Sequence, residues 1–348
     1  MKNQEIIANI RTLVQNGTVT ADISALLLRH GCFGLLSKLP DSPYKQQIAL
    51  SRGLNGIAVR ERYKACAPLF AQSEIPYAVI KGAVLSQRLY KDPFLRSSGD
   101  IDILIHRRDT DRLKELLLAN GFVQGRVTKH GIEPFSRREI VFQATMSHQT
   151  APYVKKTGNK LCPYINLDVN TDILWGESGV HTDMDAVLSC AIPGQVLDTS
   201  IQVLCPEMEF LALCLHHYKD LNSLFLLSQG RYRLGLFCEL YEYLCMVRPD
   251  AQRLQELCRA LGVGQYLYVC VFQVREIFAD EKLDEYLSVL SPFRNEEILE
   301  TFGLADSERH VWEIPLFERL FHPDLPAYVQ SKLSPAEREK VAINRELM

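Results

Sequence analysis

Two aspartates, Asp100 and Asp102, stand two positions apart in the apolar run of residues 99–105, GDIDILI. In a β-strand alternate side chains share a face, so both carboxylates would point one way and the intervening isoleucines the other. Two carboxylates about 7 Å apart repel each other unless a cation neutralises them. Mg²⁺ is the natural cation, because it binds carboxylate and phosphate oxygens together. A D-x-D pattern is short and common in sequences. The alternative interpretation is that both aspartates are solvated at the end of a strand beside a turn.

Residues upstream of this pair could bind phosphate. The apolar run at 77–80 leads into Lys81 and Gly82, and a helical pattern follows. Glycine in a strand-to-helix turn lets backbone N–H groups and the positive end of the helix approach phosphate oxygens closely. Lys81 and Arg96 would add positive charge, and arginine can bind phosphate through two hydrogen bonds. Surface solvation is the alternative for each of these two cations. The predicted nucleotide-binding residues are Lys81, Gly82, Ala83, Arg96 and Ser98.

The elements that position these residues combine strands with helices. Apolar runs and alternating patterns predict strands at Tyr77–Ile80, Asp100–Ile105, Glu139–Met146 and Tyr164–Asn170. Helical periodicity predicts helices at 83–90 and from an Asp109 N-cap to Ala119, with Gly121 after the end. The stretch Lys155–Lys160 is predicted to be a hairpin loop. Strands and helices in this order indicate an α/β or α+β core, and of the two we expect α+β.

Helical patterns dominate both sides of this core. Apolar residues recur at helical spacing through residues 1–73, and amphipathic helices are predicted at 207–221, 231–246, 250–261 and 265–278. We therefore expect a helical N-terminal module at 1–73, a catalytic core at 74–200 and a helical C-terminal domain at 201–348.

Composition limits the class of protein. The chain has 348 residues, 39 of them basic and 42 acidic, for a formal charge of −3. This balance argues against a long nucleic acid as partner. The ten cysteines include no C-x-x-C pair, so we expect free thiols in a reducing compartment. With no signal-peptide pattern and no long uncharged stretch, we expect a cytoplasmic protein without a membrane partner.

Residues 76–106 carry a resemblance to a known family. The segment Val79–Leu85 (VIKGAVL), followed by Tyr90, Pro93, Arg96 and Asp100–Ile105, resembles the uncharacterised nucleotidyltransferase family of the DNA polymerase β superfamily, with its "KGxxL" and "R…DIDLLV" patterns. A "PE…LCLH" element at 206–216 is similar to one in the family's C-terminal part. The resemblance implies a mixed β-sheet with packed helices and a Mg²⁺-dependent NTP site. One departure is that Lys81-Gly82 replaces the superfamily's usual Gly-Gly or Gly-Ser turn.

Catalysis in this superfamily requires a third carboxylate on an adjacent strand. Asp168 is the candidate, because alternation along residues 165–170 (INLDVN) puts Asn166, Asp168 and Asn170 on one face. Asp172 is the alternative. We expect Asp100, Asp102 and Asp168 to be the catalytic and metal-binding residues.

The resulting hypothesis is an enzyme that transfers a nucleoside monophosphate from an NTP to a hydroxyl group of a small molecule or protein. A non-catalytic nucleotide-binding protein with the same fold is one rival hypothesis, and it gains if Asp168 lies far from the other two aspartates. The other rival is a phosphotransferase that uses the same site.

Overall fold

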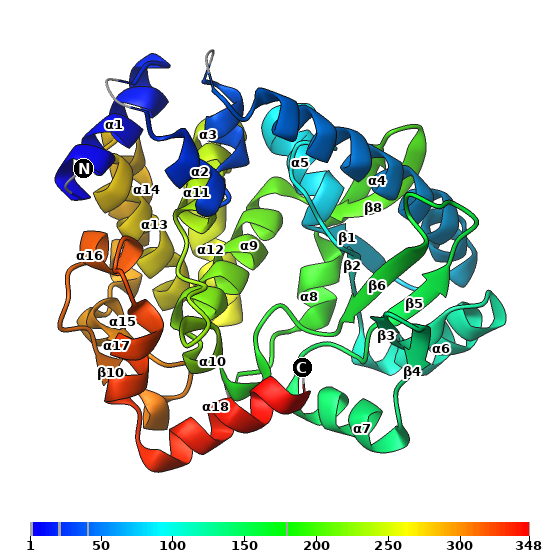
Figure 1. Ribbon diagram of the computed structural model, residues 1–348. Helices are drawn as coiled ribbons and strands as arrows, with labels where there is room; N and C mark the ends of the chain where they lie inside the picture. Colours follow the sequence, from blue (N-terminus) through cyan, green and yellow to red (C-terminus); the bar gives the residue numbers. More distant parts are fainter. Residues whose placement is uncertain (1–2, 20–21, 40–41, 179, 348) are drawn as a thin grey trace. The chain divides into compact units, whose positions relative to one another are not determined.

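The computed structural model describes residues 3–19, 22–39, 42–178 and 180–347, which divide into two units (Figure 1). One unit comprises residues 46–209, and the other joins the residues up to 45 with those from 210 onward. In this division residues 46–73 and 201–209 group with the sheet, because a long helix before the first strand packs on it. The domain boundaries near 74 and 200 stay predictions.

The first unit, residues 46–209, contains an eight-stranded mixed sheet with the strand order β4-β3-β5-β6-β2-β1-β8-β7. The neighbours β2 and β6 are parallel, as are β1 and β8, and the other neighbouring pairs are antiparallel. The strands are β1 (Tyr77–Ile80), β2 (Ile101–Ile105), β3 (Val123–Thr128), β4 (Gly131–Pro134), β5 (Tyr153–Lys156), β6 (Tyr164–Asn170), β7 (Ala191–Val196) and β8 (Thr199–Leu204). The expected α+β fold with a mixed sheet is confirmed.

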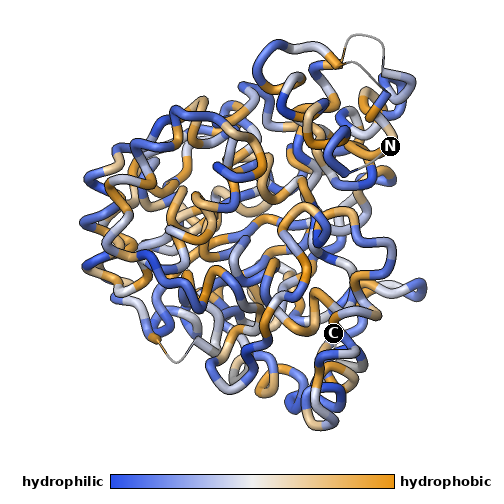
Figure 2. The backbone as a smooth tube through the Cα atoms, turned by 90° about the vertical axis from the view of Figure 1, so that its left-hand side faces the viewer, coloured by the Kyte–Doolittle hydropathy of each residue, from blue (hydrophilic) through white to orange (hydrophobic). Residues whose placement is uncertain are grey.

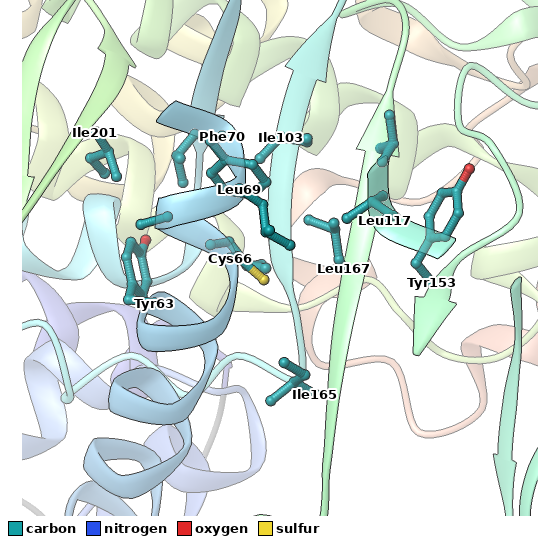
Figure 3. Close-up of a cluster of buried hydrophobic side chains, with 14 of the residues drawn as sticks. Tyr63, Cys66, Leu69, Phe70, Ile103, Leu117, Tyr153, Ile165, Leu167 and Ile201 are labelled. Atoms are coloured by element: carbon teal, nitrogen blue, oxygen red, sulfur yellow. The ribbon is translucent and has the colours of Figure 1, made fainter. Parts of the chain in front are cut away.

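Helix α4 (Lys45–Ser73) covers the apolar face of this sheet (Figure 3). Its buried side chains recur every three or four residues, as in Tyr63, Cys66 and Phe70, and they pack against Ile103 and Leu167 of the central strands. The helix is therefore held to the sheet by a continuous hydrophobic core. The other helices of this unit are α5 (Gly82–Tyr90), α6 (Thr110–Ala119), α7 (Arg137–Met146) and α8 (Met184–Ser189).

The predicted strand Glu139–Met146 was wrong, because these residues lie in helix α7. A capping box starts the helix: Glu139 N–H donates to Ser136 Oγ (3.3 Å), and Ser136 N–H donates to Glu139 Oε2 (2.7 Å). The cap gives the Ser136 and Glu139 N–H groups acceptors within the start of the helix, so neither needs a neighbouring strand. Apolar and polar residues alternate here, but this alternation does not correspond to alternating burial. Residues 137–144 are all exposed or partly exposed.

Other predicted elements of this unit are confirmed. Strands β1 and β6 have the predicted bounds, and α6 follows Asp109, although the Asp109 side chain makes no capping hydrogen bond. Gly121 has a φ of 80°, which suits a glycine after a helix. The predicted hairpin loop contains the turn between β5 and β6, but Lys155 and Lys156 belong to β5. Hairpin β7–β8 was not predicted.

The second unit is helical apart from a short two-stranded sheet, β9 (Thr301–Phe302) with β10 (His310–Val311). Its helices are α1 (Asn3–Asn16), α2 (Ser24–Arg29), α3 (Phe33–Ser37), α9 (Pro206–Asn222, which begins in the first unit), α10 (Leu224–Leu227), α11 (Leu234–Met246), α12 (Ala251–Leu261), α13 (Gly264–Phe278), α14 (Asp284–Leu290), α15 (Glu296–Glu300), α16 (Leu316–Leu320), α17 (Leu325–Lys332) and α18 (Pro335–Leu347). The predicted C-terminal helices at 207–278 are confirmed.

Polar and apolar stretches alternate along the chain (Figure 2). In the described ranges, no helix has the length and apolar character needed to cross a membrane. All ten cysteines are free, as predicted.

Candidate active site

Asp102 and Asp168 occupy paired positions on the neighbouring parallel strands β2 and β6. The adjacent residues Ile101 and Leu167 lie in the core, so alternation places both carboxylates on the opposite face. Neighbouring strands are about 4.8 Å apart, which brings the two acidic groups within reach of one cation. Asp102 is 8% exposed and Asp168 is partly buried.

The electrostatic environment of these two carboxylates favours a bound cation. Burial raises the pKa of Asp168 to about 7, with a further contribution from the negative charges of Asp102 and Asp100, while Lys81 opposes the rise. Burial also raises the pKa of Asp102; Lys81 is the largest opposing influence, and Asp100 adds to the rise. Full ionisation of both groups is therefore costly without a positive charge between them.

The turn from β1 to α5 places Lys81 beside this pair. Lys81 Nζ lies 3.9 Å from Asp102 Oδ1. The backbone of Lys81 has φ 57° and ψ −147°, and Gly82 has φ 49°. The first of these conformations is close to a region used almost only by glycine, so the lysine is strained there. Helix α5 starts at Gly82, and its first N–H groups, including that of Ala83, have no acceptor within the helix. The Ala83 side chain itself packs in the core.

The loop between α5 and β2 carries Arg96 and is anchored on both sides. Asn55 of α4 donates from Nδ2 to the carbonyl oxygens of Phe94 and Arg96, both at 2.8 Å. Ser86 Oγ accepts from the Arg96 N–H at 3.0 Å and donates to the Asp92 carbonyl at 2.6 Å. The positive charge of Arg96 is among the influences that lower the pKa of Asp102. The loop therefore holds Arg96 in the electrostatic neighbourhood of the aspartates.

Asp100 is tied to Ser98 rather than directed freely at the other carboxylates. Ser98 Oγ donates to Asp100 Oδ1 at 2.8 Å, and the Asp100 N–H donates back to Ser98 Oγ at 3.4 Å. Ser98 also borders the Lys81-Gly82 turn, because a Cβ added to Gly82 would lie 3.6 Å from Ser98 Oγ. The structure thus brings Ser98, Asp100 and the Lys81-Gly82 turn together.

Two amides outside the predicted set of site residues, Asn170 and Gln149, also lie beside Asp102. Asn170 is 1% exposed and donates from Nδ2 to Asp102 Oδ1 (3.4 Å) and to the Ile103 carbonyl (3.2 Å). Gln149 donates from Nε2 to Asn170 Oδ1 at 2.8 Å, which orients the Asn170 amide. The polar alternation of residues 166–170 was the signal for Asn170, whereas Gln149 had no local signal.

Asp172, the alternative third carboxylate, accepts hydrogen bonds from the loop that follows it. Its Oδ1 accepts from the Leu174 N–H at 2.9 Å and from the Thr182 hydroxyl, and the Thr182 N–H lies 3.4 Å from its Oδ2. These contacts use the carboxylate to close the segment between Asp172 and Thr182. The structure therefore favours Asp168 as the partner of Asp102.

The donors at this site suit a metal that is completed by its substrate. No three His, Cys, Asp or Glu side chains in the described ranges form a ready metal cluster. Asp102, which is buried, and Asp168, which is partly buried, remain as two paired carboxylates. Mg²⁺ usually keeps several waters and takes one or two carboxylates together with substrate phosphates. The residues present therefore fit this ion.

Comparison with known families identifies the enzyme class. The family model described as uncharacterised nucleotidyltransferase matches residues 22–279. The chain belongs to this family. It is accordingly a transferase of phosphorus-containing groups, and the matched range includes every site residue described above. No curated protein sequence matches this nucleotidyltransferase.

Proposed function

We propose that this chain is a Mg²⁺-dependent nucleotidyltransferase that moves a nucleoside monophosphate from an NTP to a hydroxyl group of a small molecule or protein. The observation that carries the proposal is the pairing of Asp102 with Asp168 across parallel strands. Lys81, just before α5, lies beside this pair, with its Nζ 3.9 Å from Asp102 Oδ1. This pairing also favours a catalytic protein over a non-catalytic nucleotide binder, because the third predicted carboxylate lies beside Asp102.

Charge distribution supports a phosphate-bearing substrate. Lys81 and the first N–H groups of α5 can bind phosphate oxygens, and the neighbouring carboxylates can bind a cation. The phosphates and the cation would therefore lie side by side. In this proposal Asp102 and Asp168, with Asp100 beside them, hold Mg²⁺. The bound ion would supply neutralising charge and polarise the α-phosphate.

The residues of the chain then have separate tasks. Lys81 and the α5 N–H groups receive the β- and γ-phosphates, and Arg96 adds charge from its anchored loop. Asp168, beside Asp102 on the neighbouring strand, is the carboxylate placed to accept the proton of the acceptor hydroxyl. The hydroxyl oxygen forms a bond to the α-phosphorus, and the bond from that phosphorus to the bridging oxygen breaks. Pyrophosphate leaves with the electron pair of that bond.

Labelled nucleotides test this function. The purified full-length protein is incubated with Mg²⁺ and each NTP, labelled at the α- or γ-phosphate, in the presence of a cell metabolite extract or of protein acceptors. We expect α-label in a new product together with release of γ-label as pyrophosphate. Asp102→Asn should give neither.

Two outcomes would contradict the proposal. Transfer of γ-label alone would identify a phosphotransferase. Saturable NTP binding without product in any acceptor mixture would identify a nucleotide-binding protein.

A further inference from the structure

Asn166 of β6 has a buried side-chain carbonyl oxygen that no hydrogen-bond donor contacts. In the ranges that the structure describes, no group donates to its Oδ1. Val154, opposite Asn166 on the neighbouring strand β5, is apolar and has no side-chain donor to offer. The residue as a whole is nevertheless partly exposed. A buried carbonyl oxygen without a donor is uncommon, because an unpaired polar atom out of water destabilises the fold.

Strand register puts Asn166 on the face of the sheet that carries the carboxylates. Asn166 stands two residues before Asp168 on β6, so the two side chains share a face. Its neighbours Ile165 and Leu167 lie in the hydrophobic core on the other face. One residue before the first pair of the β2–β6 ladder, Asn166 comes opposite Asp100. Asn166 is therefore about 7 Å along the strand from Asp168, one step from the proposed Mg²⁺ site.

The order of the strands separates Asn166 from the proposed phosphate-binding turn. Strands β1, β2 and β6 are neighbours in this order. Lys81 and Gly82 follow β1, Asp102 lies on β2, and Asn166 lies on β6. Adjacent strands are about 4.8 Å apart, so Asn166 is about 10 Å across the sheet from β1. An NTP with its β- and γ-phosphates at the Lys81-Gly82 turn and its α-phosphate at the carboxylates would extend toward β6. Ribose is the next group in that direction.

We propose that Asn166 binds the ribose of the nucleotide, with its Oδ1 accepting a hydrogen bond from a ribose hydroxyl group. The inference deepens the proposed function and rests on it. Ionised phosphate groups carry no hydrogen to donate to Oδ1, whereas the 2′- and 3′-hydroxyl groups of ribose do. In the proposed reaction the hydroxyl of the second substrate lies at Asp168, which leaves ribose as the hydroxyl-bearing group for Asn166. The residue would therefore favour an NTP over an analogue that lacks this hydroxyl.

The stability of the ligand-free protein distinguishes a structural role from a ligand-binding role. Asn166→Leu replaces the amide by an apolar group of similar size, so it removes the unpaired oxygen without leaving a cavity. We expect this variant to unfold at or above the wild-type temperature. Asn166→Ala, whose smaller side chain cannot overpack, is the second variant for the binding measurements. Tyr164→Phe is the matched control, because it removes a hydroxyl group from the same face of the same strand.

Nucleotide binding completes the test. Calorimetry with Mg²⁺ finds which of ATP, GTP, CTP and UTP binds most tightly, and then compares it with its 2′-deoxy and 3′-deoxy analogues and with pyrophosphate. For the wild type we expect one analogue to bind about 10-fold more weakly than the NTP, as for the loss of one hydrogen bond. In Asn166→Leu and Asn166→Ala the NTP and that analogue should bind equally, both with the weaker affinity. Pyrophosphate should bind every variant like the wild type, and Tyr164→Phe should retain the wild-type preference.

The possible failures are distinguishable. If both Asn166 variants are destabilised and keep the wild-type preference for the NTP, Asn166 is structural and only this inference falls. Weaker pyrophosphate binding in these variants, or less product at unchanged nucleotide Kd values, would overturn the assignment to ribose. Equal affinity of the wild type for the NTP and both analogues would do the same. If the wild-type protein binds neither an NTP nor pyrophosphate, the inference and the proposed function both fall.

Discussion

Asp102 of β2 and Asp168 of β6 form a directly opposed pair on two parallel strands, although helices α6 and α7 and strands β3, β4 and β5 separate them in the sequence. The pair is buried on the face opposite the hydrophobic core, with Lys81 Nζ 3.9 Å from Asp102. Two carboxylates on neighbouring strands repel each other when both are charged, so the pair lowers the stability of the fold. Residues that lower stability in this way are typical of functional sites.

Replacing Asp102 by asparagine should remove the charge that we propose to hold Mg²⁺ while keeping the shape of the side chain. We expect transfer activity to fall by about 10²–10⁴-fold or more with an unchanged circular dichroism spectrum. Asp198→Asn, in the exposed β7–β8 turn, is the control and should remain active. Retained activity in Asp102→Asn would contradict the assignment of this residue.

Asp168→Asn should separate activity from stability. At pH 8 and without metal, the wild-type Asp168 carboxylate is charged despite burial and the nearby Asp102. The neutral variant avoids this repulsion, so we expect its Tm to be higher, by about 2–4 °C for each kcal/mol gained in a domain of this size. Transfer activity should be lost. A lower Tm for the variant at this pH would mean that the carboxylate supports the fold.

Gln149 and Asn170 should affect cation affinity through Asp102. Gln149→Leu removes the donor that orients the Asn170 amide, and Asn170→Ala removes the hydrogen bond to Asp102 Oδ1. Partners of metal ligands typically contribute 10- to 100-fold in affinity, so we expect the Kd for Mn²⁺ with nucleotide to rise by about that factor. Gln72→Leu, at an exposed position of α4, should leave it unchanged. Equal affinities in all three variants would exclude a positioning role.

Lys81 should show opposite effects of its backbone and its side chain. Because its φ of 57° is strained for a lysine, Lys81→Gly should be more stable than Lys81→Ala by about 1 kcal/mol in urea unfolding. Both variants lose the ammonium group and should have a higher KM for the NTP. Equal stability of the two variants would show that this turn carries no strain.

His30 predicts a dependence of stability on pH in the helical unit. Burial lowers its pKa to about 4, with Arg29 and Arg233 adding to the effect, and its Nδ1 accepts from the Leu234 N–H at 3.3 Å. The unfolded chain binds this proton near pH 6.5, so stability is full above that pH and falls as the pH drops toward 4.

The His30→Gln variant tests this assignment. Its free energy of unfolding should vary less between pH 6.5 and 4 than that of the wild type. His181→Gln, at an exposed position, is the control and should retain the wild-type slope. If the free energy of unfolding falls equally steeply with pH in the wild type and in His30→Gln, groups other than His30 cause the loss of stability.

Local signals in the sequence were sufficient for much of the site. The apolar run at Tyr77–Ile80, the alternation along Tyr164–Asn170 and the Lys81-Gly82 turn depend on neighbouring residues, and the structure has these elements where they were predicted. The same reasoning was wrong for α7, where the capping pair Ser136 and Glu139 outweighed an apparent alternation.

Sequence alone therefore determined which residues could do chemistry: a carboxylate pair at Asp100 and Asp102, a phosphate turn at Lys81-Gly82, and Asp168 as a candidate partner. Only the tertiary structure decided that Asp168 pairs with Asp102 and that Gln149 orients Asn170. The physical reason is that strand register and helix packing depend on burial between residues far apart in the chain, and no local pattern records that burial.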